Sequence, residues 1–398
     1  MAPSLHIGIC GPCSPRAFAG DLGVDNESLP VGLGGTPVNH LTRALLDLGH
    51  RVSLATLDRH VGQDQRIHVT GDSLSMSVGP YREKHRAWDG FAIERRSVQE
   101  AMDQAAPDAI TAHWSYEFAL GAIDSGIPTL VTIRDVPIEV FRHQPSPYRF
   151  IRWMMHRETM ARAASIAFNS DYTRRRLRHP RSRLAPVLPN ALPDRLWRVE
   201  SRGAPNAVNP IFISVNNGFG RRKNVHVLLT AFRKVRQQAP GAQLLLIGSG
   251  YEQRGPAAAW ARRHASNEGV EYLGTLDYVA TLDALRAADV LVHPSLEESF
   301  GYTLIEAASV GTPVIAGKDS GAVPWVLDNG AQGVLVDVRS SADIAAAMLS
   351  LVRDVATWSE LRERAFLRGR ARFSTSAVAK QYVQVLQEMV DASSARTR

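Results

Sequence analysis

The chain has 398 residues, of which 44% are hydrophobic, and it carries a formal net charge of +7. This length excludes a single small domain and indicates two or more, and no stretch approaches the roughly 20 apolar residues that a membrane-spanning helix needs. The first residues lack the basic and apolar regions of a signal peptide, and only two cysteines are present, so we expect a cytoplasmic protein. The positive charge favours anionic partners such as phosphates or anionic lipid, and we expect no nucleic acid partner.

Apolar strands alternate with amphipathic helices through the first half of the chain. The pattern predicts strands at 5–10, 51–57, 108–114, 129–133 and 165–168. A helix is expected after the first strand, with Thr36 as its N-cap and Pro37 at its first position. Such alternation predicts a parallel sheet covered by helices, and we assign residues 1–190 to a first Rossmann-like domain.

Both cysteines lie in "CGPC", Cys10 to Cys13, directly after the first expected strand. This is the motif of thioredoxin-like redox proteins, in which the first thiol lies at a helix N-terminus. Here prolines and glycines follow that do not suit a helix, and too little chain precedes Cys10 for the strands that normally come first. We therefore favour a buried Cys10 that ends the strand, followed by a long loop.

That loop ends in a glycine run that includes Gly34 and Gly35, at the carboxyl end of the first strand, where an α/β domain meets its ligand. The run does not fit the dinucleotide pattern G-x-G-x-x-G, because a long loop separates strand from helix and Pro37 replaces the third glycine. "GTPVIAGK" in the second half is a near miss to a P-loop. The simplest metal-site and serine-hydrolase motifs do not occur.

The second half of the chain begins with a change in amino-acid composition. Residues 191–209 are rich in Pro, Asn and Arg and lack periodicity, which predicts a linker. A second α/β series follows, with strands expected at 211–216, 242–248, 270–274, 290–295, 312–317 and 333–337. The predicted fold class is α/β, with two Rossmann-like parallel-sheet domains facing a cleft, and residues 210–374 form the second of them.

Two glutamates carry the most informative pattern. Glu298 is expected in a loop after an apolar strand, and Glu306 inside the helix that follows. Gly301 allows close backbone approach between them, and the N–H groups of Tyr302 and Thr303 can face an anion at the helix start. Two carboxylates with amides between them suit a nucleotide sugar, which has hydroxyls at both ends and phosphates in the middle. For an isolated pair, the simpler interpretation is a solvated Glu298 and a Glu306 that caps its own helix.

A basic loop supports the first interpretation. Arg221, Arg222 and Lys223 follow a glycine-rich stretch at the start of a helix, where cations oppose the helix dipole unless an anion binds. A surface basic cluster is the alternative. Another strand ends in a Gly-Ser-Gly turn at Gly248, so three strand ends are expected to converge on one site.

The run "EESFGYTLIEAASVGTPVIA" resembles the signature of retaining glycosyltransferases of family four, which have the GT-B fold. The resemblance covers nearly the whole chain. It implies that residues 375–398 form a helix that crosses back to the first domain, which would hold the acceptor.

The resemblance also implies roles for individual residues. Glu306 would bind the nucleotide ribose, Glu298 the donor sugar hydroxyls, and Lys223 the departing diphosphate. Matching motifs in the first half suggest His113 and Asp135 near the cleft. The remaining donor-binding positions implied by the motifs are Gly34, Gly35, Gly248, Ser299, Phe300, Gly301, Tyr302 and Thr303.

The chain departs from the family pattern in three places. Gly218 stands where an arginine is usual, and Arg221 is a guess at its replacement. Arg134 stands where many members have a histidine that touches the sugar. Pro324 and Trp325 occupy the region of a common glutamate.

These features predict a glycosyltransferase that moves a sugar from a UDP- or GDP-linked donor to an acceptor hydroxyl. Lys223 and helix amides supply positive charge to the leaving group, so we expect no metal and no other cofactor. No residue stands out as a covalent nucleophile, which favours front-face retention. A GT-B epimerase or phosphorylase, or a nucleotide-sugar-binding protein without turnover, remains the alternative. The acceptor could be a sugar, a lipid-linked or a small molecule, and the oligomeric state is open.

One stretch of the first half suggests contact with an anionic membrane. Residues 146–164 mix aromatic and methionine side chains with arginines, which suits an amphipathic helix on a bilayer surface. A second basic run follows, with Arg174, Arg175, Arg176, Arg178, Arg181 and Arg183. The alternative is that the aromatic and methionine side chains pack on the first sheet while the arginines stay solvated.

Overall fold

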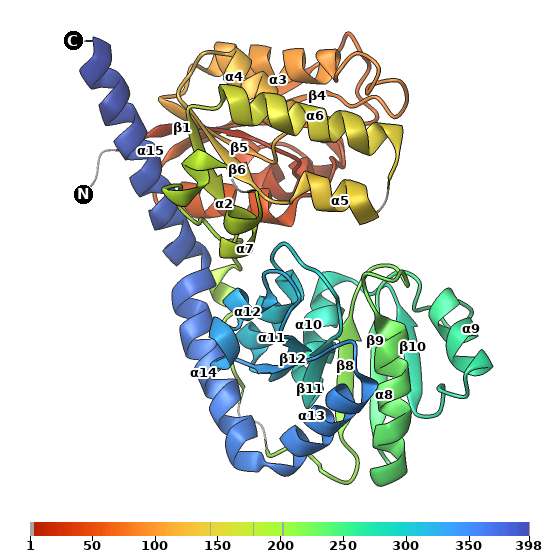
Figure 1. Ribbon diagram of the computed structural model, residues 1–398. Coiled ribbons are helices and arrows are strands. Elements are labelled where there is room, and N and C mark those ends of the chain that lie inside the picture. Colours follow the sequence, from red (N-terminus) through yellow and green to blue (C-terminus); the bar gives the residue numbers. More distant parts are fainter. Residues whose placement is uncertain (1–3, 144, 178, 201–202, 398) are drawn as a thin grey trace. The chain divides into compact units, whose positions relative to one another are not determined.

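The computed structural model describes residues 4–143, 145–177, 179–200 and 203–397, and the chain divides into two compact units (Figure 1). Unit 1 comprises Met1–Ala191 and Thr375–Arg398, and unit 2 comprises Leu192–Ser374. Each unit is a parallel-sheet α/β structure, which confirms the predicted fold class. None of the described helices is both long enough and apolar enough to cross a membrane.

Unit 1 is built on a seven-stranded sheet in the order β3-β4-β2-β1-β5-β6-β7. Its strands are β1 His6–Cys10, β2 Arg51–Asp58, β3 Ile67–Thr70, β4 Leu74–Pro80, β5 Ala109–His113, β6 Thr129–Ile133 and β7 Ser165–Phe168. Neighbouring strands run parallel, except for the antiparallel pair of β3 and β4. The pattern of apolar runs predicts all of these except β3 and β4, because β3 is half exposed at the sheet edge and β4 alternates serine with apolar residues.

Helices cover both faces of this sheet. They are α1 Ala19–Leu22, α2 Thr36–Asp47, α3 Ala92–Ala105, α4 Glu117–Asp124, α5 Pro137–His143, α6 Pro147–Arg162, α7 Asp171–Arg176 and α15 Thr375–Thr397. Helix α2 begins at Thr36, with Gly35 as its N-cap, so the prediction that Thr36 is the N-cap is wrong by one residue. Ser146 caps α6 by accepting a hydrogen bond from the backbone N–H of Arg149.

The last helix completes the core of unit 1. Helix α15 contacts α2 and β5 and buries Val378, Ala379, Tyr382 and Leu386 in the same hydrophobic cluster as residues of β1. The hydroxyl of Tyr382 lies 3.3 Å from Oγ1 of Thr132 on β6. The predicted return of the C-terminal helix to the first domain is therefore confirmed.

Unit 2 has a six-stranded parallel sheet in the order β10-β9-β8-β11-β12-β13. Its strands are β8 Ile211–Val215, β9 Gln243–Ile247, β10 Val270–Gly274, β11 Val290–His293, β12 Val314–Gly317 and β13 Val334–Val336. Its helices are α8 Val225–Gln238, α9 Pro256–Arg263, α10 Tyr278–Ala287, α11 Tyr302–Val310, α12 Val323–Val326, α13 Ser341–Arg353 and α14 Val355–Phe373. In the segment expected to be a linker, Leu192 pairs with Ser374 and Trp197 is buried in the core of this unit.

The parallel strands fix where ligands can bind. The carboxyl ends of parallel strands lie along one edge of the sheet, so the loops after β8, β9, β11 and β12 share one edge of unit 2. In unit 1 the loops after β1, β5 and β6 likewise share one edge.

Candidate active site

In unit 2 the basic loop after β8 packs against the glutamate loop after β11. The Nζ atom of Lys223 lies 2.6 Å from Oε1 of Glu298. The backbone N–H of Leu296 donates to the carbonyl oxygen of Arg222 at 2.8 Å. Asn224 donates from Nδ2 to the carbonyl oxygens of Pro294 and Val338, at 3.1 and 2.8 Å. The predicted convergence of these strand ends is confirmed.

The loop after β12 supports the glutamate from the other side. The N–H of Ala322 donates to the carbonyl oxygen of Glu298 at 2.8 Å. Gly321 has a φ of +66°, and a Cβ atom there would lie 2.4 Å from the same oxygen. A side chain at position 321 would therefore displace the backbone of Glu298.

Glu298 is held in its ionised form. Burial on its own would raise the pKa of Glu298, but the contacts with His293 and Lys223 outweigh it and keep the pKa well below its usual range. Nε2 of His293 lies 3.4 Å from Oε1 of Glu298. An ionised carboxylate accepts hydrogen bonds only, so Glu298 is suited to bind hydroxyl groups.

Glu306 lies inside α11, as predicted, and has a different environment. Burial raises its pKa to about 7, although a hydrogen bond with the hydroxyl of Tyr278 opposes the shift. Tyr278 is the first residue of α10, and α10 packs against α11. Glu306 therefore changes its charge near neutral pH, whereas Glu298 does not.

The start of α11 lies between the two glutamates. Gly301 is its N-cap, with a φ of +89°, and has no side chain to cap the helix. Phe300 is buried and packs with Trp325 and Phe373, so only its backbone is available to a ligand. Of the other donor-binding residues that the motifs imply here, Ser299, Tyr302 and Thr303 are half-buried.

The Gly-Ser-Gly turn after β9 lies beside the loop after β8. Gly248 has a φ of +122°, and a Cβ atom there would lie 1.8 Å from the carbonyl oxygen of Asn216. The N–H of Gly218 donates to the carbonyl oxygen of Ser249 at 2.9 Å, and the hydroxyl of Tyr251 donates to the carbonyl oxygen of Gly218 at 2.9 Å. Gly248 is thus needed for the close approach of two loops at this edge.

In unit 1, His113 ends β5 and is fully buried. Its Nδ1 accepts hydrogen bonds from Nε and Nη2 of Arg134, at 3.1 and 2.7 Å. Burial and the charge of Arg134 lower the pKa of His113 well below its usual value, so the ring is neutral and carries its proton on Nε2. Arg134 also donates to Oδ1 of Asn190, which fixes the guanidinium.

Asp135 follows β6 and lies in a separate set of contacts. The hydroxyl of Tyr116 donates to its Oδ2 at 2.9 Å, and the other oxygen, Oδ1, has no hydrogen-bond partner among the described residues. Burial raises the pKa of Asp135, against the positive charge of Arg152. The structure thus places His113 and Asp135 at the same sheet edge, but His113 binds Arg134 and Asp135 binds Tyr116.

The glycine pair lies where the loop after β1 meets α2. Gly35 has a φ of +107°, and a Cβ atom there would lie 1.9 Å from the carbonyl oxygen of Pro12. Gly34 has a φ of +76°, and a Cβ atom there would meet nothing within 4 Å among the described residues. Gly35 is therefore required by packing, whereas Gly34 leaves open space beside the loop.

Comparison with known proteins decides the family. Residues 200–371 match the model of the glycosyl transferases group 1, and residues 34–191 match the glycosyl transferase 4-like domain. The chain belongs to the group 1 glycosyltransferases. Together the two matches span most of both units.

Individual relatives of this glycosyltransferase have different activities. A glycogen synthase of Mycobacterium tuberculosis is 27% identical over 395 residues, which cover 90% of this chain and 92% of that protein. A phosphatidyl-myo-inositol mannosyltransferase of the same species is 37% identical over 183 residues, covering 44% and 46%.

Solved structures share the fold. The sucrose-phosphate synthase of Thermosynechococcus elongatus has a TM-score of 0.73 at 20% identity, covering 98% of this chain and 100% of that one. Anabaena HepE, solved in complex with UDP-glucose, has a TM-score of 0.67 at 16% identity, covering 96% and 100%.

The structure of the glycosyltransferase adds residues that sequence reasoning does not assign. Nη1 of Arg222 donates to the carbonyl oxygen of Glu297 at 3.1 Å and lies 3.9 Å from Oε2 of Glu298, whereas Arg221 is exposed. His293 and Tyr278 are the other additions. His293 directly ends β11, so its place at the carboxyl end of a strand is the signal that could have identified it.

The two cysteines of "CGPC" are not in surroundings that would make their thiols reactive. Cys10 ends β1 and is fully buried, as predicted. Burial raises the pKa of the Cys13 thiol to about 12 and that of the Cys10 thiol well above its usual range. A reactive thiol needs a lowered pKa, so both cysteines serve the packing of the core.

Proposed function

We propose that this glycosyltransferase moves a sugar from a UDP- or GDP-linked donor to an acceptor hydroxyl, with retention of configuration and without a metal ion. The observation that carries the proposal is the 2.6 Å contact between Lys223, in the loop after β8, and Glu298, in the loop after β11. The complex of Anabaena HepE with UDP-glucose supports a nucleotide-sugar donor.

Lys223 is suited to stabilise the leaving group. A nucleoside diphosphate gains negative charge as the glycosidic bond breaks, and a fixed ammonium group with helix amides lowers the energy of that state. In the structure Lys223 is paired with Glu298, so binding of the diphosphate would share or replace this contact. The positive charge then comes from the protein, which is why we infer no metal.

The two glutamates divide the recognition of the donor. Glu298, which is ionised, would accept hydrogen bonds from the sugar hydroxyls beside the bond that breaks. Glu306 would accept hydrogen bonds from the ribose hydroxyls, with the start of α11 between them. We assign no covalent nucleophile, and in a front-face reaction the leaving phosphate oxygen takes the proton of the acceptor hydroxyl.

The test is the Lys223→Ala variant. Its turnover should fall by about a hundredfold or more, as expected for loss of a charge-stabilising donor, and its diphosphate affinity should fall too. Lys234→Ala is the matched control, because Lys234 lies on α8 of the same unit, within the core-packed helix that follows the basic loop. An unchanged rate in Lys223→Ala would contradict the proposal, as would complete loss of wild-type activity in EDTA that Mg²⁺ or Mn²⁺ restores.

Hydrolysis of the donor separates transfer from the other activities of this fold. A transferase releases some sugar to water when no acceptor is present, whereas a protein that only binds the nucleotide sugar releases none. Thermal-shift screening of UDP, GDP, ADP and their sugars should first identify the donor. The anomeric configuration of the product, measured by NMR, then decides between retention and inversion.

A further inference from the structure

Helix α6 has a solvent-facing stripe that is apolar and basic. Positions 150, 153, 154, 157 and 161 lie on one face of the helix, because their spacing follows its turns. They carry Phe150, Trp153, Met154, Arg157 and Ala161. The opposite face, with Met155, His156, Thr159 and Met160, is buried against the rest of unit 1. The helix is therefore anchored by one face and presents a second apolar face to solvent.

The apolar side chains of α6 pack in part as the simpler interpretation of the sequence expects, since Met155 and Met160 are buried, but those of the stripe do not. Phe150 is 46% and Met154 is 44% exposed, so these side chains do not pack on the sheet as the simpler interpretation requires. Phe150 lies with its ring 5.6 Å from that of Trp153 and 6.2 Å from that of Phe141 on α5. A continuous row of aromatic rings differs from the scattered apolar residues that are normal on a surface.

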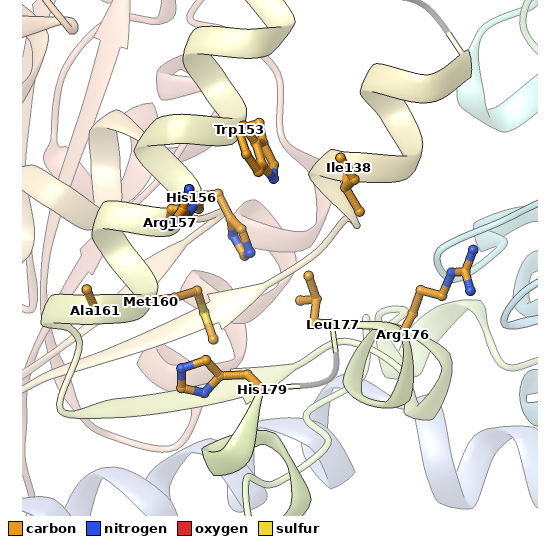
Figure 2. Close-up of a pocket in the computed structure, with 9 residues that line it drawn as sticks. All are labelled: Ile138, Trp153, His156, Arg157, Met160, Ala161, Arg176, Leu177 and His179. Atoms are coloured by element: carbon orange, nitrogen blue, oxygen red, sulfur yellow. The ribbon is translucent and has the colours of Figure 1, made fainter.

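A cavity of about 370 Å³ opens beside the stripe, between α5, α6 and α7 (Figure 2). Its wall includes Trp153 and Arg157 from the stripe, with Ile138, Met160 and Leu177 as apolar lining. The ring of His156 points into it and bonds through Nδ1 to Oγ of Ser115 at 2.7 Å. Burial lowers the pKa of His156 to about 4, so this ring adds no charge at neutral pH.

The charges around the stripe are positive. Arg157 stacks over the ring of Trp153 at 5.3 Å, and Arg149 lies in the first turn of the helix. Arg142 of α5 pairs with Glu139 at 3.0 Å, so it adds little charge of its own. The one acidic residue of α6, Glu158, is bound on another side by Arg95 and Arg162. An anionic surface therefore complements the stripe.

The basic run on α7 is less available than the sequence suggests. Arg174 and Arg175 pair with Asp171, at 2.5 and 2.6 Å, and Arg176 pairs with Glu139 at 2.6 Å. Arg178 lies outside the described residues. The stripe on α6, and not the run on α7, is thus the better candidate for a contact surface.

We propose that the solvent-facing stripe of α6 docks on an anionic lipid bilayer, with Phe150, Trp153 and Met154 in the interface and the adjoining cavity occupied by part of a lipid. Basic and aromatic side chains on one helix face suit the headgroup region of such a bilayer. If the function proposed above holds, the acceptor is membrane-borne, because His156 of the cavity bonds to Ser115, which lies two residues after His113 at the end of β5.

The test is co-sedimentation of the full chain with phosphatidylglycerol vesicles, and with phosphatidylcholine vesicles for comparison. The wild type should bind only the anionic vesicles, and the binding should weaken as salt screens the arginines. The double variant Phe150→Ser, Met154→Ser should bind about tenfold more weakly, because its apolar contact area is lost. Val355→Ser, Leu367→Ser is the matched control, since these residues of α14 are 45% and 57% exposed.

A second pair of variants tests the charge. Arg157→Gln should weaken binding severalfold and flatten its salt dependence, whereas Arg263→Gln, at an exposed position of α9 in unit 2, should not. The fluorescence of Trp153 should be quenched by lipids with a spin label in the headgroup region, and Trp153→Phe should remove that part of the quenching.

Three outcomes would overturn the proposal. They are a wild type that stays in the supernatant at low salt, a stripe variant that binds like the control, or a stripe that holds a second copy of the chain. Ultracentrifugation reveals the last as a dimer that the stripe variant loses. Donor hydrolysis is measured on every variant, so a failure of lipid binding with intact hydrolysis leaves the proposed transferase standing.

Discussion

Glu298 and Glu306 have the same side chain but different charges, because their neighbours differ. Glu298 contacts Lys223 and His293 and stays ionised, whereas Glu306 is half-buried beside the Tyr278 hydroxyl and has a pKa of about 7. At neutral pH one glutamate is always an acceptor of hydrogen bonds, while the other is divided between two protonation states.

This difference predicts a pH dependence of nucleotide binding. If an ionised Glu306 accepts hydrogen bonds from the ribose, affinity should rise roughly tenfold between about pH 6 and pH 8. Glu306→Gln should lose that rise, and Glu306→Ala should weaken binding at the upper pH by about 1–3 kcal/mol. Calorimetric titration with the nucleoside diphosphate over this range measures both effects. If affinity rises with pH equally in the wild type and in Glu306→Gln, the rise comes from ionisation of the ligand's own phosphate and not from Glu306.

The stability of the protein should follow the same titration with the opposite sign. The pKa of Glu306 is about 7 in the folded chain and 4.5 in the unfolded one, so the folded state holds the proton more tightly. The contribution of Glu306 to stability is therefore complete below about pH 4.5 and is lost as pH rises through about 7. Glu306→Gln should not show this loss in thermal unfolding.

The sequence places Lys223 and Glu298 in one site because both follow strands of one parallel sheet, whose carboxyl ends lie along one edge. Their direct contact is known only from the structure. It cannot choose between Arg221 and Arg222, because adjacent loop residues point in directions that only the loop's own hydrogen bonds set. It also cannot find the contact of Tyr278 with Glu306, which depends on how α10 packs against α11.

At the scale of elements, two neighbouring glycines where the β1 loop meets α2 have different roles: Gly35 is needed for packing, and Gly34 is free to face a ligand. Gly35→Ala would place a Cβ atom 1.9 Å from the carbonyl oxygen of Pro12 at a φ of +107°. We expect it to lower the free energy of unfolding by more than about 2 kcal/mol. Gly34→Ala has open space and should lower it by about 1 kcal/mol, through backbone strain alone.

Thermal unfolding of the two variants, together with donor hydrolysis, measures this contrast. If Gly34 faces a ligand, Gly34→Ala should reduce activity more than its stability explains. Equal unfolding temperatures for the two variants would show that the close approach of Gly35 to Pro12 is wrong.

Most strands can be predicted from the sequence, because a strand buried in a parallel sheet has a continuous run of apolar residues. The exceptions are instructive. Strand β4 interrupts its apolar run with serines, and β3 depends on its pairing with β4 more than on its own residues. The true start of α2 at Thr36 depends on the left-handed backbone of Gly35, which sequence preference for a capping threonine does not reveal.

For the whole molecule, the packing of α15 in unit 1 predicts that the two units depend differently on the C-terminal helix. Removal of Thr375–Arg398 takes Val378, Ala379, Tyr382 and Leu386 from the core of unit 1, and Val378 and Leu386 alone are worth about 1.5–3 kcal/mol each at full burial. That loss is comparable to the entire stability of a domain, so unit 1 should unfold while unit 2 stays folded. Hydrogen exchange resolved by segment measures the two units separately.

The control for this truncation ends the chain after Asp391, because residues 392–395 are exposed. That shorter deletion should leave both units intact. If the longer deletion also leaves the exchange of β1 and β5 unchanged, the packing of α15 on unit 1 is wrong.

The place of α15 in the chain also sets the order in which the protein can fold as it is made. Its Tyr382 contacts Thr132, which is 250 residues earlier, so the ribosome must release all of unit 2 before that contact can form. Unit 2 is continuous in sequence and can finish its core first. Unit 1 emerges first but waits with an open apolar surface over β1 and α2, and such surfaces favour aggregation during synthesis. The segment that nascent unit 1 lacks is thus translated after all of unit 2, and chaperones that shield apolar surface should act between the emergence of unit 1 and that of α15.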